Sequence, residues 1–415
     1  MPRKASIVLV LAVVYIDMLG IGLAFPILPR LIQRFEGGDF SKGAWIFGLL
    51  AAAYALMQFL FAPALGALSD RFGRRPVLLL ALLGMGINYI VLATAPTLGW
   101  LVVGRIVAGA MGASFSIANA YLADITPPEK RAQSFGLIGA AFGFGFITGP
   151  AIGGVLGNID LRLPFFVASG LSFANLAFGF FMLPESLAPA NRRPFKFARA
   201  NPLGALGAIG HQPAVLSLLL VFVLATFANR VAESTWVLFA SYRFHWSPAA
   251  VGISLAMVGV MFVIGQGGLV RIVVPKLGER RAILLGLFVS AVVFVLYGSV
   301  PQGWMVYPVM VLALFGWTIA QPASMGVMSR SVPADEQGLL QGAIASMNSL
   351  TAVAGPPIWT GIFAYSVSRS APLIVPGAAF YGGALVFLLA LVLAARISSP
   401  SPAPVVISDG GVARP

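Results

Sequence analysis

The chain has 415 residues, of which 59% are hydrophobic and only 9% are charged, and its mean hydropathy is +0.93. A water-soluble domain of this length and composition would aggregate, so the lipid bilayer must be its solvent. The formal net charge is +13, but the Lys and Arg residues lie between apolar runs and not along one basic stripe, which argues against nucleic-acid binding.

Twelve apolar runs, each long enough to cross a hydrocarbon core as a helix of about twenty residues, follow one another along the chain. We therefore predict an all-α integral membrane protein that resides in a lipid bilayer. The first run holds Asp17 and has no small-residue cleavage pattern after it, so we interpret it as a retained span and not a signal peptide. The runs lie roughly at 6–28, 45–68, 76–95, 98–122, 134–157, 163–183, 214–240, 249–272, 281–299, 303–326, 338–364 and 373–396.

The basic residues predict the orientation of these spans. Eighteen of the 26 Lys and Arg residues fall in segments on the side of the N-terminus, and six fall in loops on the other side. Because cytoplasmic loops carry an excess of Lys and Arg, this bias predicts that both termini are cytoplasmic.

The chain divides near its middle. Residues 184–213 combine several prolines with four Lys and Arg residues, which is the composition of a basic cytoplasmic linker on an anionic membrane surface. We predict a six-helix bundle at 1–183 and a second at 214–397, and a disordered tail at 398–415 that is rich in Pro, Ser and Gly.

The two halves also repeat each other. Five residues of the first half recur in the second at an offset of 206 residues, which indicates an internal duplication of six spans. The pairs are Pro127 with Pro333, Glu129 with Asp335, Gly136 with Gly342, Gly149 with Gly355 and Pro150 with Pro356. The turn at Gly73 and the turn at Gly278 are also similar in sequence, since arginines follow the glycine in both, but the match is less exact.

Two motifs stand out from the apolar background. The turn between the second and third spans combines glycines, which permit tight turns, with an acid and bases that can pair with neighbouring helix ends. Its diagnostic residues are Gly66, Asp70, Arg71, Gly73, Arg74 and Arg75. The fifth span carries small residues and a proline that allow close helix packing and a bend. These are Gly136, Gly145, Gly149, Pro150, Gly153 and Gly154.

With these motifs the chain resembles the major facilitator superfamily, and within it the tetracycline-resistance branch of twelve-span drug/proton antiporters. The resemblance also covers the segments beginning at Asp17, Gly104 and Ala123. It implies the major facilitator fold of two six-helix bundles. It further implies that Asp70 and Arg74, with Asp124, form a cytoplasmic gate that latches the outward-facing state, and that the glycines of the fifth span form the antiporter motif.

Charges inside spans are the first functional candidates, because burying them is costly. Asp17 lies at mid-depth in the first span, where a carboxylate can be neutralised by a proton, and by the resemblance Arg105 is its partner in proton coupling. A purely structural Asp17–Arg pair is the alternative. Arg230 and Glu233 are three residues apart on one helical face, so they either neutralise each other or leave Glu233 as a second titratable group in the cavity.

Neutral polar and aromatic residues within the spans are predicted to line a substrate cavity. Each of them is equally suited to packing between helices, which is the alternative. The candidates are Gln58, Asn88, Asn119, Phe142, Phe146, Trp236 and Gln266. We expect neither a metal site nor a cofactor, since the chain has no cysteine and its two histidines are far apart.

Three departures from the tetracycline exporters bear on the substrate. The resemblance leads one to expect ionisable groups where this chain has Asn88, Phe262 and Ser290, so tetracycline itself is in doubt. We predict an inner-membrane antiporter of bacteria that acts as a monomer, is not an enzyme, and exports small amphipathic organic compounds in exchange for protons. Export of an endogenous metabolite (a sugar, peptide or siderophore) and a non-transporting receptor are the alternatives.

Overall fold

The computed structural model describes residues 7–112, 114–193, 213–333 and 336–397. The predicted disordered tail, most of the predicted linker and Asp335 of the internal repeat lie outside these residues. The described part of the chain is almost entirely helical within its predicted spans, so the predicted all-α class is confirmed.

The first bundle contains six spans, of which the first and fourth are each divided into two helices. Pro29 at the start of α2 and Gly112 at the end of α5 mark the two divisions, because proline and glycine interrupt regular helices. The helices are α1 (Ile7–Ala24), α2 (Leu28–Phe35), α3 (Phe40–Phe72), α4 (Arg74–Thr94), α5 (Leu98–Met111), α6 (Ser114–Ile125), α7 (Arg131–Ile159) and α8 (Leu163–Met182).

The second bundle repeats this plan. Counted along the whole chain, the eighth span contains a π-helical turn over Gly265–Leu269, and the tenth span is divided before Trp317. The helices are α10 (Pro213–Arg243), α11 (Pro248–Ile264), α12 (Val270–Leu277), α13 (Glu279–Ser299), α14 (Val306–Ala313), α15 (Trp317–Arg330), α16 (Gln337–Ser366) and α17 (Ala378–Arg396).

Within the described residues, eleven helical segments are long and apolar enough to cross a membrane, one fewer than the twelve predicted runs. The remaining run, predicted at 338–364, is present as the 30-residue helix α16. Gln341 and Asn348, together with several Gly and Pro residues, lower the hydropathy of α16. Its length still suffices to span a bilayer, at about 1.5 Å per residue.

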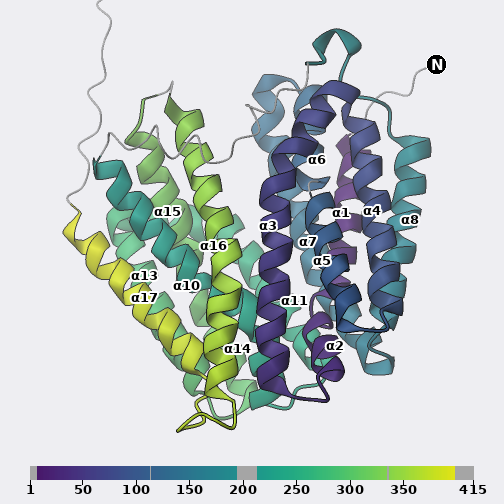
Figure 1. Cartoon of the computed structure of the whole chain (residues 1–415). Coiled ribbons are helices and arrows are strands. Elements are labelled where there is room, and N and C mark those ends of the chain that lie inside the picture. The colour runs from purple at the N-terminus through teal and green to yellow at the C-terminus, as the bar shows by residue number, and fades with distance from the viewer. Residues whose placement is uncertain (1–6, 113, 194–212, 334–335, 398–415) are drawn as a thin grey trace, which may run out of the picture.

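The two bundles meet along two helix pairs, α7 with α11 and α3 with α16. They converge at the lower end of Figure 1 and diverge at the upper end. We call the upper end, which carries the turn between α3 and α4, the Gly73 end, and the lower end the Trp246 end.

Side-chain contacts join the bundles at the Trp246 end. Arg30 of α2 donates hydrogen bonds to Ser241 Oγ (3.0 Å) and to the carbonyl of Trp246. Ser41 Oγ donates to the carbonyl of Ala364 at 2.8 Å. At the Gly73 end, by contrast, Phe72 is half exposed and a Cβ added at Gly66 would meet no atom within 4 Å. In the part of the chain that the structure describes, the bundles are therefore joined at the Trp246 end and separate at the Gly73 end.

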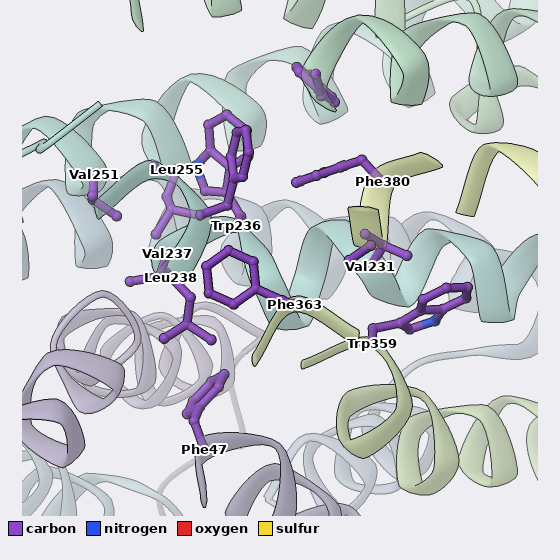
Figure 2. Packing of buried hydrophobic residues seen from close by; sticks show 14 of the residues in the cluster. Phe47, Val231, Trp236, Val237, Leu238, Val251, Leu255, Trp359, Phe363 and Phe380 are labelled. Carbon is purple, nitrogen blue, oxygen red and sulfur yellow. The ribbon is translucent and has the colours of Figure 1, made fainter. Parts of the chain in front are cut away.

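A large apolar core extends through both bundles, and Phe47 of α3 is one of its members from the first bundle (Figure 2). Trp236 belongs to this core: its ring contacts those of Phe380 and Tyr297, and its Nε1 donates to Ser254 Oγ at 2.9 Å. Because Trp236 is buried and its one polar atom is paired, it packs the bundle in this structure and lines no open surface, unlike the cavity residue predicted from the sequence.

Candidate functional site

Asp17 lies in the middle of α1 and is only 4% exposed. Its Oδ2 accepts a hydrogen bond of 2.5 Å from Ser114 Oγ, at the start of α6. Among the described residues four ion pairs form, and none includes Asp17 or Arg105. The structure therefore pairs Asp17 with a neutral hydroxyl and not with the expected arginine.

Arg105 on α5 instead places its guanidinium over the ring of Tyr54, 5.6 Å from the centroid. Its Nε is buried without a hydrogen-bond partner. A cation on an aromatic face is stabilised by the ring quadrupole, but less than by a carboxylate at contact distance. Arg105 thus retains an unused hydrogen-bond donor in this structure.

Asn88 on α4 is fully buried, and both atoms of its amide lack a partner. Its Oδ1 lies 3.0 Å from a Cβ added at Gly104, so it packs at the contact of α4 with α5. This placement differs from the predicted cavity position, because a buried side chain cannot touch a ligand between the bundles without rearrangement.

The turn at Gly73 brings its predicted residues together. Arg74 Nη1 lies 2.6 Å from Asp70 Oδ1, and Arg74 Nε lies 3.2 Å from Asp124 Oδ2 at the end of α6. Gly73 has a φ of 108°, which only glycine adopts without strain. All three charged residues belong to the first bundle, so the predicted latch components are assembled while this end is open.

The other residues of the turn face outward or anchor the neighbouring helix. Arg75 donates to the carbonyl of Phe180 at 2.5 Å and stacks on that ring, while Arg71 lies over the ring of Phe72. These stacked arginines hold their apolar stems against the helix surface and their charges at its edge.

Glu185, which follows α8, was not among the residues predicted from the sequence. Its carboxylate accepts hydrogen bonds from the backbone N–H groups of Arg74 (2.8 Å) and Arg75 (3.2 Å). It thereby satisfies the N-terminus of α4, whose own first residues are basic. A Cβ added at Gly73 would lie 2.3 Å from Glu185 Oε2, so the glycine makes room for this contact.

The glycine motif of α7 lets two other helices approach closely. A Cβ added at Gly145 would lie 2.7 Å from Met18 Cβ on α1, and one at Gly149 2.7 Å from Gly22 Cα. Gly153 contacts Leu23 in the same way. The adjacent Gly154 and Pro150 contact Pro248 and Gly252 of α11, in the other bundle. Gly136, by contrast, has open space around it.

Three predicted polar residues occupy different surroundings. Gln58 donates to the carbonyl of Gly112, between α5 and α6, at 3.0 Å. Asn119 donates to the carbonyl of Phe115, one turn earlier on α6, at 3.0 Å. Gln266 lies in the π-helical turn that joins α11 to α12, and such turns are frequent at functional sites.

Arg230 and Glu233 pair with each other, as one of the two predicted alternatives states. Asn229 adds a hydrogen bond to Glu233 Oε1 at 3.2 Å, and Arg230 donates to the carbonyl of Asn348 on α16 at 3.3 Å. The Glu233 side chain is nevertheless half exposed. Arg230 and Glu233 thus neutralise each other, while the Glu233 carboxylate remains accessible to solvent.

The structure also describes the two other positions at which the resemblance implies ionisable groups. Phe262 on α11 is half exposed, while Ser290 on α13 is buried and donates to the carbonyl of Gly286 at 2.8 Å. Within the described residues no group of three His, Cys, Asp or Glu side chains is arranged to hold a metal ion.

Comparisons with known proteins agree with this architecture. Tetracycline resistance protein, class C, of Escherichia coli is 42% identical over 382 residues, which cover 92% of this chain and 96% of that protein. The class D protein of Salmonella ordonez is 38% identical, covering 95% and 98%.

Solved structures share the fold. The human organic anion transporter MFSD10 (TETRAN) has a TM-score of 0.67 and 26% identity, covering 94% of this chain and 98% of that one. A bacterial homolog of the human lysosomal transporter Spinster, inward-facing and occupied, has a TM-score of 0.76 at 15% identity, covering 96% and 98%. A sequence model of the Major Facilitator Superfamily matches residues 7–356. The chain therefore belongs to the Major Facilitator Superfamily.

Proposed function

We propose that this protein is a secondary active transporter that exports small amphipathic organic compounds in exchange for protons, by alternating access of its two bundles. The similarity to tetracycline resistance proteins over almost the whole chain supports drug export. Two bundles that meet at one end and separate at the other are the form that alternating access requires.

The observation that carries proton coupling is the environment of Asp17. It is a buried carboxylate with a single hydroxyl donor and no ion pair among the described residues. A carboxylate without a fixed counter-charge in an apolar setting changes its protonation state readily. By the family resemblance, Arg105 takes part in the same proton coupling, and Glu233 offers a second, more accessible carboxylate.

The charge bias of the loops supports a cytoplasmic location of both termini in the bacterial inner membrane. With that orientation, the Gly73 end opens to the cytoplasm. When this end closes, Asp70 and Arg74 would meet the second bundle, and Asp124 would hold Arg74 in position for that contact. The protein would work as a monomer, since each chain holds both bundles.

The test uses everted membrane vesicles with an acid interior and a panel of compounds that includes tetracycline with Mg²⁺ and ethidium. We expect at least one compound to dissipate the proton gradient, and Asp17→Asn to abolish this dissipation. Asp39→Asn is the matched control, because Asp39 caps α3 by accepting a hydrogen bond from the backbone N–H of Lys42, which an Asn side chain also accepts.

Two results would contradict the proposal: no compound collapses the gradient, or Asp17→Asn exports like the wild type. A separate growth assay with tetracycline addresses the subfamily. Weak or absent resistance is expected, because a buried, neutral Asn88, together with Phe262 and Ser290, replaces ionisable groups.

A further inference from the structure

Four phenylalanines from three segments form a continuous row in the first bundle. Phe25 follows α1, Phe115 lies on α6, and Phe142 and Phe146 lie one turn apart on α7. The ring centroids are 5.9 Å apart for Phe25 and Phe146, 6.3 Å for Phe146 and Phe142, and 5.5 Å for Phe142 and Phe115. We call these four rings the phenylalanine row.

The geometry of α7 shows where the row points. Gly145 and Gly149 contact α1, whereas Gly143 and Ile147 contact α11 of the other bundle. Successive residues of a helix are rotated by about 100°, so Phe142 and Phe146 fall between these two contact faces. Their rings therefore point into the wedge between α1 and α11, where the bundles separate toward the Gly73 end.

Part of the row is uncovered. Phe142 is 38% exposed and Phe115 is 36% exposed, although their contacts place them on the inner side of the bundle. Phe144, also on α7, is 58% exposed, but it lies on the side of the helix away from both contacts. An exposed ring facing the bilayer is ordinary, whereas an exposed ring between two bundles marks a surface that a ligand can cover.

The row ends beside the proposed proton site. Ser114, the neighbour of Phe115, donates the 2.5 Å hydrogen bond to Asp17. Asn119 follows Phe115 by four residues and therefore lies on the same face of α6. Apolar ring surface and polar groups thus converge on one place, which is the composition of small-molecule sites.

We propose that the phenylalanine row is the binding platform for a planar aromatic ring system of the exported compound, whose polar substituents reach Asn119 and Ser114. This inference rests on the proposed export function and specifies the chemical class of its substrate. Planar rings stack offset on, or meet edge to face with, phenylalanine rings, and a globular apolar group of equal area lacks that added attraction. Binding next to Ser114 also changes the surroundings of Asp17, which links the ligand to the proton.

The experiment measures dissociation constants of two monovalent organic cations for the purified full chain, without a proton gradient. Ethidium is planar and fused, whereas tetraphenylphosphonium is propeller-shaped. We expect the wild type to prefer ethidium. Phe142→Leu and Phe115→Leu should each weaken ethidium binding about tenfold and change tetraphenylphosphonium binding little. Phe142→Tyr should retain ethidium binding, since it keeps the ring.

Phe144→Leu is the matched control, because it makes the same change on the same helix but away from the row. It should bind ethidium within about twofold of the wild type, as expected for a ring outside the site. The proposal is overturned if Phe142→Leu and Phe144→Leu have equal effects, if Phe142→Leu weakens both probes alike, or if the wild type binds neither probe. The elution volume of each variant in size-exclusion chromatography and its circular dichroism spectrum show whether it is folded.

Different results would overturn the proposed binding platform and the proposed export function. Asp17→Asn should lose proton-driven export in vesicles, whereas the purified variant should still prefer ethidium to tetraphenylphosphonium, because its phenylalanine row is unchanged. Intact export by Phe142→Leu, with unchanged ethidium binding, would reject the platform and leave proton antiport standing.

Discussion

The turns at Gly73 and Gly278 have the same backbone shape but opposite charge arrangements. Each glycine ends one helix and begins the next, with φ and ψ of 108° and 157° at Gly73 and 74° and 153° at Gly278. In the first bundle Arg74 pairs with Asp124, while in the second Glu279 pairs with Arg330. Asp124 and Arg330 are related by the 206-residue offset of the internal repeat.

This inversion matters because of the helix dipoles. Acidic groups are favoured at helix N-termini and basic groups at C-termini. Glu279 at the start of α13 and Arg330 at the end of α15 obey this rule, whereas Arg74 at the start of α4 and Asp124 at the end of α6 oppose it. Glu185 compensates from outside by binding the N-terminus of α4.

The two turns therefore have different roles. The charged groups at the Gly278 turn, Glu279 and Arg330, agree with the dipoles of the helices that carry them. The Gly73 turn is held by a partner from the end of α8 and by a buried arginine with three side-chain acceptors, namely Asp70, Asp124 and Ser69. An arrangement that opposes the local dipoles and depends on distant partners is suited to change between states, which is the role proposed for this gate.

The largest expected effect comes from adding a methyl group at each turn. Both alanine variants adopt a backbone region that costs about 1–3 kcal/mol for a non-glycine residue. At Gly73 the new Cβ also collides with Glu185, while at Gly278 it meets no atom within 4 Å. We expect Gly73→Ala to lower the unfolding free energy by a further 1–3 kcal/mol or so, through the disturbed hydrogen bonds of Glu185.

The measurement is the apparent Tm of each purified variant in detergent. Gly278→Ala serves as the control for backbone strain alone. Equal losses of Tm in the two variants would contradict the importance of the Glu185 contact.

The next effect concerns Arg74, whose side chain is only 11% exposed. Arg74→Gln removes a buried cation that binds two carboxylates, and we expect it to lower the unfolding free energy by about 2 kcal/mol. It should also slow export, because the gate loses its central residue. Arg280→Gln is the control: Arg280 is exposed and donates one hydrogen bond, to the carbonyl of Ala395. A loss of Tm in Arg280→Gln as large as in Arg74→Gln would contradict this assignment.

The sequence predicts the fold well because the bilayer imposes it. Apolar runs of spanning length predict the helices, and the glycine spacing of α7 predicts its close contacts with α1. Asp70 and Arg74 of the Gly73 turn form an ion pair, as their spacing of four residues in a contiguous motif allows.

Side-chain direction is harder to predict, because lipid and protein interior are equally apolar. Trp236 and Asn88 are therefore predicted as cavity residues although they are buried, and Phe25 and Phe115 are not predicted at all. Glu185 lies about a hundred residues from the helix it caps, so no local pattern reveals it. Ser114 is overlooked because the resemblance to the antiporter family directs attention to Arg105 as the partner of Asp17.

A smaller effect is expected at Glu185. Glu185→Gln keeps the shape of the side chain but removes the charge that opposes the positive end of α4 and shares hydrogen bonds with Ser186 and Leu187. We expect a loss of about 1 kcal/mol in unfolding free energy. In the second bundle, Glu279→Gln should cost less, since the partner of Glu279 is the exposed side chain of Arg330. Tm measurements at low and high salt separate the two, because salt screens a pair with an exposed partner more strongly.

The smallest effect is the pairing energy of Glu279 with Arg330, whose side chains are 29% and 62% exposed. A double-mutant cycle with Glu279→Gln and Arg330→Gln should give a coupling of roughly 0.5 kcal/mol or less, as for other exposed pairs. The equivalent cycle with Arg74→Gln and Asp124→Asn should give a coupling at least twice as large, since Arg74 is nearly buried. Similar couplings in both cycles would mean that burial does not distinguish the turns, and the Gly73 turn would then differ from its repeat only through Glu185.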